Sequence, residues 1–222
     1  VLLYAYAEWG PECLQKIEGM FAFAIYDSIQ STIFLARDFA GQKPLYYSLK
    51  DGSLLFASEL KSIIALDPNL KSLNYPAALS YFHNGFIPND SSIISSIKKL
   101  PPAHALFFDL KTRDYTILDF HNLAKTINSK YNKQVRPVPE KIVLEMEKLL
   151  NKSVQEQLIA DVPIGVLLSG GLDSSLVTAL AARNTSKLKT FSVVFPNFPQ
   201  YNEQTHSRLI AEHYKTDHLE ID

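Results

Sequence analysis

Apolar and polar residues follow two different patterns along the chain, and the pattern changes after about residue 120. In the first region, short apolar segments alternate with turn residues, which is typical of β-strands joined by hairpins. Strands are predicted over 20–26, 33–38, 45–49, 54–58, 105–109 and 115–118, and helices over 1–9, 11–17 and 59–65. Because no helical crossover separates the hairpins, the pattern predicts an antiparallel sheet in an α+β layer.

The second region begins with a long amphipathic segment, in which apolar residues mark one face of a helix over 140–159. Strands over 164–168, 190–195 and 218–221 then alternate with helices over 173–182 and 203–214. This β-α-β-α-β order predicts an α/β unit with a parallel sheet and right-handed crossovers. The polar segment 121–139 contains two prolines and is predicted to link the domains 1–120 and 140–222.

The turn after the first strand of the second region carries the strongest chemical signal. Its sequence is Leu168-Ser169-Gly170-Gly171-Leu172-Asp173-Ser174-Ser175, and a helix follows at once. Glycines permit a tight turn with exposed N–H groups, and the helix start adds unpaired donors and a partial positive charge. The serine hydroxyls can donate to the same anion, so a phosphate-binding loop is predicted. The Asp173 carboxylate would repel phosphate unless a magnesium ion lay between them.

This turn is not a Walker loop, because that motif requires Gly-Lys-Ser/Thr and no lysine lies near it. It resembles instead the pyrophosphate loop of the N-type ATP pyrophosphatases, which cleave ATP to AMP and pyrophosphate. An ordinary strand-to-helix connection is the alternative, because glycine–serine turns are common. The run of small donors beside Asp173 favours the phosphate-binding interpretation.

Composition narrows the classes of function. A net charge of −1 over 222 residues predicts no nucleic-acid or membrane partner, and no apolar run reaches membrane-spanning length. The hydrophobic fraction of 46% is that of a globular protein. The single cysteine, Cys13, excludes an internal disulfide and suits a reducing cytoplasm. Because Cys13 lies in a predicted short helix, a packed cysteine is expected rather than a nucleophile.

Structural roles are the favoured interpretation for other residues of types that often serve in catalysis or metal binding. The six histidines are scattered, and no pair has the local spacing of a zinc site. Arg37 and Asp38, at the end of a strand, are predicted to form a structural ion pair and turn rather than a catalytic pair. Glu203 opens a predicted helix, where it either complements the helix dipole or lies beside a nucleotide.

Several short segments, spread over nearly the whole chain, share their order and spacing with one known family. They are 19–27, 36–38, 41–47, 56–61, 100–104 and 161–175. In these segments the chain resembles the glutamine-hydrolysing asparagine synthetases, although the family usually has glycine where Ala103 stands. The resemblance implies that residues 1–120 form the C-terminal part of an N-terminal-nucleophile glutaminase sheet layer, of the class II glutamine amidotransferase type. Residues 140–222 would begin an adenine-nucleotide hydrolase-like ATP pyrophosphatase domain.

The resemblance also implies a reaction, in which ammonia released from glutamine passes through a tunnel and converts an aspartyl adenylate to asparagine. ATP and Mg²⁺ would be the cofactors, and glutamine and aspartate the other small-molecule partners, in a cytoplasmic protein whose full-length form is expected to be a homodimer. Pyrophosphate and magnesium would be held by Ser169, Gly170, Gly171, Asp173, Ser174 and Ser175. Adenosine would contact Leu167 and Val193, and the tunnel would be lined by Met20 and Leu167. An apolar lining suits neutral ammonia rather than ammonium.

The catalytic residues of the glutaminase reaction are not expected in this chain. The family's nucleophilic cysteine stands at the mature N-terminus, but position 1 here is Val1, and the glutamine-binding elements have no counterpart. An internal fragment is therefore expected, inactive by itself. Three alternatives stay open: a paralogue acting on another carboxylate, as in surface-sugar or β-lactam synthesis; another pyrophosphatase-loop enzyme, such as those making argininosuccinate, GMP or thiolated tRNA; and a non-catalytic truncated remnant.

Overall fold

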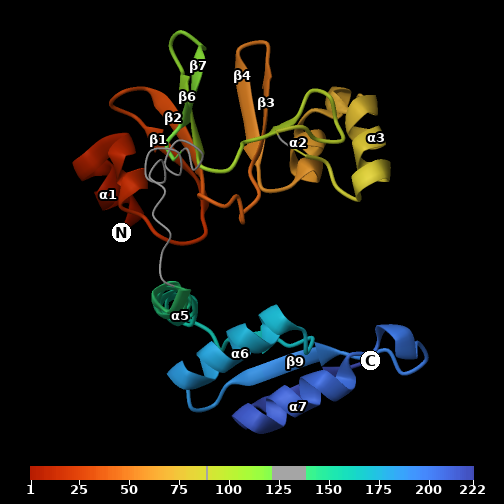
Figure 1. Cartoon of the computed structure of the whole chain (residues 1–222). Coiled ribbons are helices and arrows are strands. Elements are labelled where there is room, and N and C mark those ends of the chain that lie inside the picture. The colour runs from red at the N-terminus through yellow and green to blue at the C-terminus, as the bar shows by residue number, and fades with distance from the viewer. Residues whose placement is uncertain (89, 122–138) are drawn as a thin grey trace. The chain divides into compact units, whose positions relative to one another are not determined.

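The computed structural model describes residues 1–88, 90–121 and 139–222, which fall into two compact units, Val1–Lys133 and Gln134–Asp222 (Figure 1). Residues 122–138, and with them most of the predicted linker, lie outside the described residues. No helix in the described part of the chain is long and apolar enough to cross a membrane.

The first unit contains two antiparallel sheets rather than the single sheet predicted. Its strands are β1 (Ala22–Asp27), β2 (Thr32–Arg37), β3 (Tyr46–Lys50), β4 (Ser53–Ala57), β5 (Lys98–Lys99), β6 (His104–Asp109) and β7 (Tyr115–Asp119). One sheet has the order β1-β2-β6-β7 and the other the order β4-β3-β5 (Figure 1). The expectation of one sheet was wrong because β2 pairs with the distant β6 and not with β3, the next strand in the chain.

A loop held by two charged side chains turns the chain away from β2. The Asp38 carboxylate accepts three backbone hydrogen bonds, at 2.9–3.1 Å, from Ala40, Gln42 and Lys43. The Arg37 guanidinium donates three, at 2.6–2.7 Å, to the carbonyl groups of Gly41, Lys43 and Leu100. The predicted ion pair between Arg37 and Asp38 is therefore wrong, because backbone groups of the loop engage both side chains. Burial alone would raise the pKa of Asp38, but the hydrogen bonds that its carboxylate accepts from backbone N–H groups hold the pKa below its usual value.

Helices flank the strands of the first unit. They are α1 (Leu2–Trp9), α2 (Leu60–Leu66) and α3 (Tyr75–Asn84), with 3₁₀ turns at Gly10–Gln15 and Pro68–Leu70. The helix α3 was not predicted from the sequence, because its residues do not form a clear apolar face. In the structure only Ala77 of this helix is buried. Its ends are nevertheless well defined: the Asn74 side chain accepts a hydrogen bond from the Ala77 N–H, and Gly85 ends the helix with φ 78°.

The core lies on both faces of the four-stranded sheet, because successive side chains of β2 point to opposite sides. Phe34 and Ala36 belong to a cluster with Cys13 on one face, and Leu35 belongs to a cluster with Leu45 on the other. Phe34 also stacks on Phe107, with 4.7 Å between ring centroids. Cys13 is fully buried, which confirms a packed cysteine, and burial raises the pKa of its thiol.

Left-handed residues at two turns of this unit bear on the sequence predictions. Asp51 and Gly52 have φ 51° and 68°, which confirms the predicted hairpin turn between β3 and β4. Ala103, just before β6, has φ 58°. A left-handed backbone explains why glycine suits this position, since an L-residue with a side chain is strained there.

The second unit has the predicted β-α-β-α-β order after its first helix. Its elements are α5 (Pro139–Gln157), β8 (Gly165–Leu167), α6 (Leu172–Asn184), β9 (Lys189–Val193), a 3₁₀ turn (Pro199–Tyr201), α7 (Gln204–Tyr214) and β10 (Asp217–Ile221). The strands are parallel in the order β10-β9-β8, which confirms the parallel sheet.

The helices α6 and α7 contact each other, as two right-handed crossovers that advance in the same direction require. Thr190 on the face that they cover is fully buried, and Val166 and His218 pair with it in register. The opposite face carries Leu167 and Leu219, which are exposed. The sheet therefore presents one covered face and one open apolar face in the described unit.

Candidate functional site

The loop between β8 and α6 begins at a buried anchor. Leu168 is 1% exposed, and its N–H donates to the carbonyl oxygen of Phe191 at 2.7 Å. Its own carbonyl oxygen accepts a hydrogen bond from the Ser192 hydroxyl. Both contacts tie the start of the loop to β9, so that the loop leaves the sheet at the carboxyl ends of two parallel strands. Open α/β sheets bind their ligands at this edge.

Inside the loop, four of the predicted site residues lie together. The Ser169 and Ser174 hydroxyl oxygens are 2.9 Å apart, and the Gly171 N–H donates to the Ser169 hydroxyl at 3.3 Å. The Ser174 hydroxyl also lies 3.2 Å from the Gly171 carbonyl oxygen, to which it can donate. Gly170 has φ 85°, so the turn requires a residue that tolerates the left-handed region.

The first turn of α6 presents unpaired donors at the loop. The helix begins with the bond from the Ser175 N–H to the Gly171 carbonyl oxygen, at 3.0 Å. The N–H groups of Leu172, Asp173 and Ser174 have no acceptor within the described part of the chain. Three free N–H groups at a helix start, together with serine hydroxyls, form an anion-binding arrangement.

Asp173 fits a role as a ligand of Mg²⁺ bound to phosphate. Its carboxylate is exposed in the first turn of α6 and has no partner among the residues that the structure describes. Nor do any three His, Cys, Asp or Glu side chains in ranges 1–88, 90–121 and 139–222 converge to hold a metal. Protein sites often hold Mg²⁺ through one or two carboxylates together with substrate phosphates and water. One exposed carboxylate beside a loop with free N–H groups and serine hydroxyls meets that requirement.

Two exposed apolar side chains lie at the same edge of the sheet. Leu167 is 77% exposed and Val193 is 59% exposed. Leu167 pairs with Phe191, two residues before Val193 in β9, so both side chains lie on the face that α6 and α7 leave open. An open apolar surface next to an anion-binding loop suits a ligand with a flat, weakly polar base and a phosphate chain.

The start of α7 lies directly against the loop. A Cβ atom added at Gly170 would lie 2.6 Å from the Cβ of His206 and 2.7 Å from the backbone nitrogen of Ser207. Gly171 is different, because its nearest neighbour would be the Ser169 hydroxyl at 3.4 Å. The glycine at position 170 is therefore required both by its dihedral angle and by the close approach of α7.

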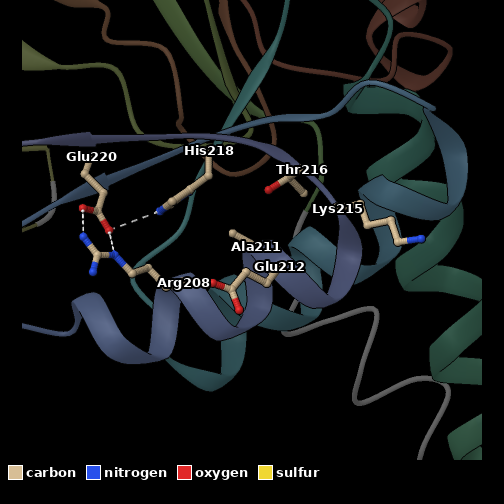
Figure 2. A pocket seen from close by; sticks show the side chains of 7 residues that line it. All are labelled: Arg208, Ala211, Glu212, Lys215, Thr216, His218 and Glu220. Atoms are coloured by element: carbon tan, nitrogen blue, oxygen red, sulfur yellow. Dashed lines mark hydrogen bonds and ion pairs between the residues drawn. The ribbon is translucent and has the colours of Figure 1, made fainter.

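An ion pair ties α7 to β10 (Figure 2). Two nitrogens of the Arg208 guanidinium donate to the two carboxylate oxygens of Glu220 at 2.6 and 2.7 Å. The Gln204 amide donates to the same carboxylate at 2.7 Å. Arg208 and Gln204 together hold the pKa of Glu220 at about 2. This ion pair was not predicted from the sequence, and it fixes the helix that supports the loop.

A hollow of about 410 Å³ lies beside this ion pair (Figure 2). It is lined by Arg208, Ala211, Glu212, Lys215, Thr216, His218 and Glu220. In its wall the Nδ1 atom of His218 lies 2.9 Å from the Thr190 hydroxyl. Nε2 has no hydrogen-bond partner in the described structure, and it lies 3.9 Å from the Glu220 carboxylate (Figure 2). Lys215 and Thr216 precede β10, so this hollow extends to the amino-terminal ends of the strands, whereas the loop lies at their carboxyl ends. The hollow is therefore separate from the loop.

Comparison with known proteins shows the family of the chain. Residues 1–118 match the family described as glutamine amidotransferase domain, and residues 145–222 match the family described as asparagine synthase. A Bacillus subtilis protein named asparagine synthetase [glutamine-hydrolyzing] 3 is 35% identical over 90% of this chain. The chain belongs to the glutamine-hydrolysing asparagine synthetase family.

Two other relatives of this family cover nearly the whole chain. A Methanocaldococcus jannaschii protein, provisionally named as a second glutamine-hydrolysing asparagine synthetase, is 37% identical over 98% of this chain. Asparagine synthetase B of Escherichia coli is 32% identical over 100% of it. The chain spans 41% of the M. jannaschii protein, 32% of the B. subtilis protein and 36% of the E. coli protein.

The other predicted residues are Met20, Glu203 and Ser175. Met20 is 46% exposed and immediately precedes β1 in the first unit. Its proposed partner in the tunnel, Leu167, belongs to the second unit, and the tunnel stays a prediction. Glu203 is the residue before α7, and its carbonyl oxygen accepts from the Ser207 N–H at 3.1 Å. Ser175 lies in the first turn of α6 and is partly buried.

Proposed function

We propose that this chain is the central part of an ATP-dependent amide ligase, an asparagine synthase that takes ammonia from glutamine. ATP would convert the side-chain carboxylate of aspartate to an adenylate, and ammonia would displace AMP to give asparagine. The observation that carries the proposal is the loop at Ser169–Ser175, with free helix N–H groups and an unpaired carboxylate beside two exposed apolar strand ends. The names of the relatives supply the acceptor.

The residues of the site would divide the work between the two ends of ATP. Ser169, Ser174 and Ser175, with the N–H groups that follow Gly171, would bind the pyrophosphate end, because they donate without carrying charge. Asp173 would hold Mg²⁺ against the phosphate oxygens, and this ion would stabilise the charge that develops on the leaving pyrophosphate. Leu167 and Val193 would cover the adenosine end.

The first unit would supply the ammonia side of the reaction. Its strands would belong to the sheet layer of an N-terminal-nucleophile glutaminase, and residues 140–222 to an adenine-nucleotide hydrolase-like domain. Met20 and Leu167 would line the ammonia path. Glutamine hydrolysis would require a nucleophile that this chain does not hold at position 1, so the chain alone is expected to release no glutamate from glutamine. The full-length protein would be a cytoplasmic homodimer.

Calorimetric titration of the chain with ATP and Mg²⁺ tests the nucleotide site. The wild-type chain is expected to bind in the micromolar range and Asp173→Ala at least about tenfold more weakly, because a metal-mediated contact is worth more than a neutral hydrogen bond. Asp217→Ala is the matched control, since Asp217 is an exposed aspartate at the amino-terminal end of β10, away from the carboxyl ends where the loop lies. Equal affinities for the two variants would contradict the proposed role of Asp173.

A further inference from the structure

One side chain of α7 faces the loop without belonging to it. Of all atoms that a Cβ at Gly170 would meet, the nearest is the Cβ of His206, at 2.6 Å. The His206 side chain therefore leaves α7 on the side that faces the loop. This approach is possible because the loop has no side chain at position 170.

The His206 ring is available to a ligand. The residue is exposed, and its side chain has no hydrogen bond or ion pair with the described part of the chain. Its backbone is fixed, because the His206 N–H donates to the Glu203 carbonyl oxygen at 3.0 Å in the first turn of α7. The ring is thus unpaired, while its point of attachment is held beside Gly170.

The loop itself lacks a basic side chain. Residues 168–175 contain backbone N–H groups and serine hydroxyls as donors, and their only charged side chain is Asp173. A polyphosphate carries several negative charges, and a bound Mg²⁺ ion neutralises only part of them. A histidine ring always carries at least one N–H donor and becomes a cation when protonated. His206 could therefore supply a donor that the loop does not provide.

We propose that His206 is a further phosphate-binding residue of this site and donates a ring N–H to an oxygen of the pyrophosphate group. This proposal rests on the proposed function of the loop. It assigns to α7 a direct role in binding, in addition to its packing against Gly170. The contact is made to the pyrophosphate end of ATP and not to adenosine.

Titration of the 222-residue chain with magnesium pyrophosphate tests this contact. His206→Ala is expected to bind about tenfold more weakly than the wild type, which is the loss typical of a hydrogen bond to a charged group. His206→Gln keeps an N–H donor and is expected to recover most of the affinity. His213→Ala, seven residues later on the same helix and also exposed, is the matched control and is expected to bind like the wild type.

Histidine ring NMR gives a readout that a packing role would not change. On addition of magnesium pyrophosphate the His206 ring signal is expected to shift and the His213 signal to stay. Wild-type affinity in His206→Ala, or an unshifted His206 signal while the wild-type chain binds, would overturn the proposal and leave the proposed function intact. If the folded wild-type chain binds neither pyrophosphate nor ATP, the proposed nucleotide site is wrong for this chain and the His206 contact is wrong with it.

Discussion

Replacing Gly170 with alanine tests whether the loop and α7 form one packed structure. The backbone at Gly170 has φ 85°, and the added methyl group would lie 2.6–2.9 Å from three atoms of His206 and Ser207. Two of these atoms are backbone atoms of α7, which cannot move as the end of a flexible side chain can. The substitution must therefore shift the helix, the loop or both.

The expected cost follows from two contributions. A left-handed backbone costs an L-residue about 1–2 kcal/mol. Forcing an additional methyl group into a packed contact costs about 1–3 kcal/mol. Their sum, about 2–5 kcal/mol, is a large share of the roughly 5–15 kcal/mol that stabilises a typical domain. Each kcal/mol lowers the melting temperature of a domain of this size by about 4–8 °C, so Gly170→Ala is expected to lower that of the second unit by about 10 °C or more.

Gly171→Ala is the control for this experiment. Gly171 has φ −71°, and its added Cβ would meet only the Ser169 hydroxyl at 3.4 Å. Because alanine is a poorer residue than glycine at the position before a helix, a loss of about 1 kcal/mol or less is expected. Melting followed by circular dichroism compares the two variants, and amide hydrogen exchange shows whether α7 is loosened. Similar decreases in melting temperature for Gly170→Ala and Gly171→Ala, with unchanged amide hydrogen exchange in α7, would refute the packing argument.

Three further predictions concern other parts of the chain. Glu220 has a pKa of about 2 in the folded chain, below its ordinary value of 4.5. Its contribution to stability is therefore complete above pH 4.5 and is lost as the pH falls through 2. In an acid titration followed by circular dichroism, Glu220→Gln should lose less stability over this range than the wild type. Asp38→Ala leaves three backbone N–H groups without their acceptor and should cost about 2–4 kcal/mol in urea unfolding, and Asp38→Asn should cost less. Cys13 is fully buried and burial raises the pKa of its thiol, so a thiol reagent at pH 8 should modify it only in urea; rapid modification of the folded chain would contradict the burial.

The fold could be predicted from the sequence where the signal was local. The alternation of strands and helices after residue 139 gave the parallel sheet, and Asp51-Gly52 gave the hairpin between β3 and β4. The division of the first unit into two sheets could not be predicted, because it depends on pairing between β2 and β6, which are far apart in the chain. The backbone contacts of Arg37 that turn the chain include Leu100, also distant in sequence.

The site shows the same limit. The glycines, serines and Asp173 of the loop are contiguous, so their grouping was visible in the sequence. The approach of His206 to Gly170 could not be predicted from the sequence, because it depends on the pairing of β9 with β8. The ion pair of Arg208 with Glu220 likewise depends on the packing of α7 against β10.

The support of the loop by α7 has a consequence for the order of synthesis. On the ribosome, residue 175 emerges well before residue 220, and at about 5–20 residues per second the interval is about 2–9 s. During this interval the loop residues exist without the ion pair that holds α7 in place, and so without the wall that Gly170 packs against. The nascent chain therefore exposes an unfinished Ser169–Ser175 loop for seconds, and the proposed nucleotide would stabilise the unit once β10 has left the exit tunnel.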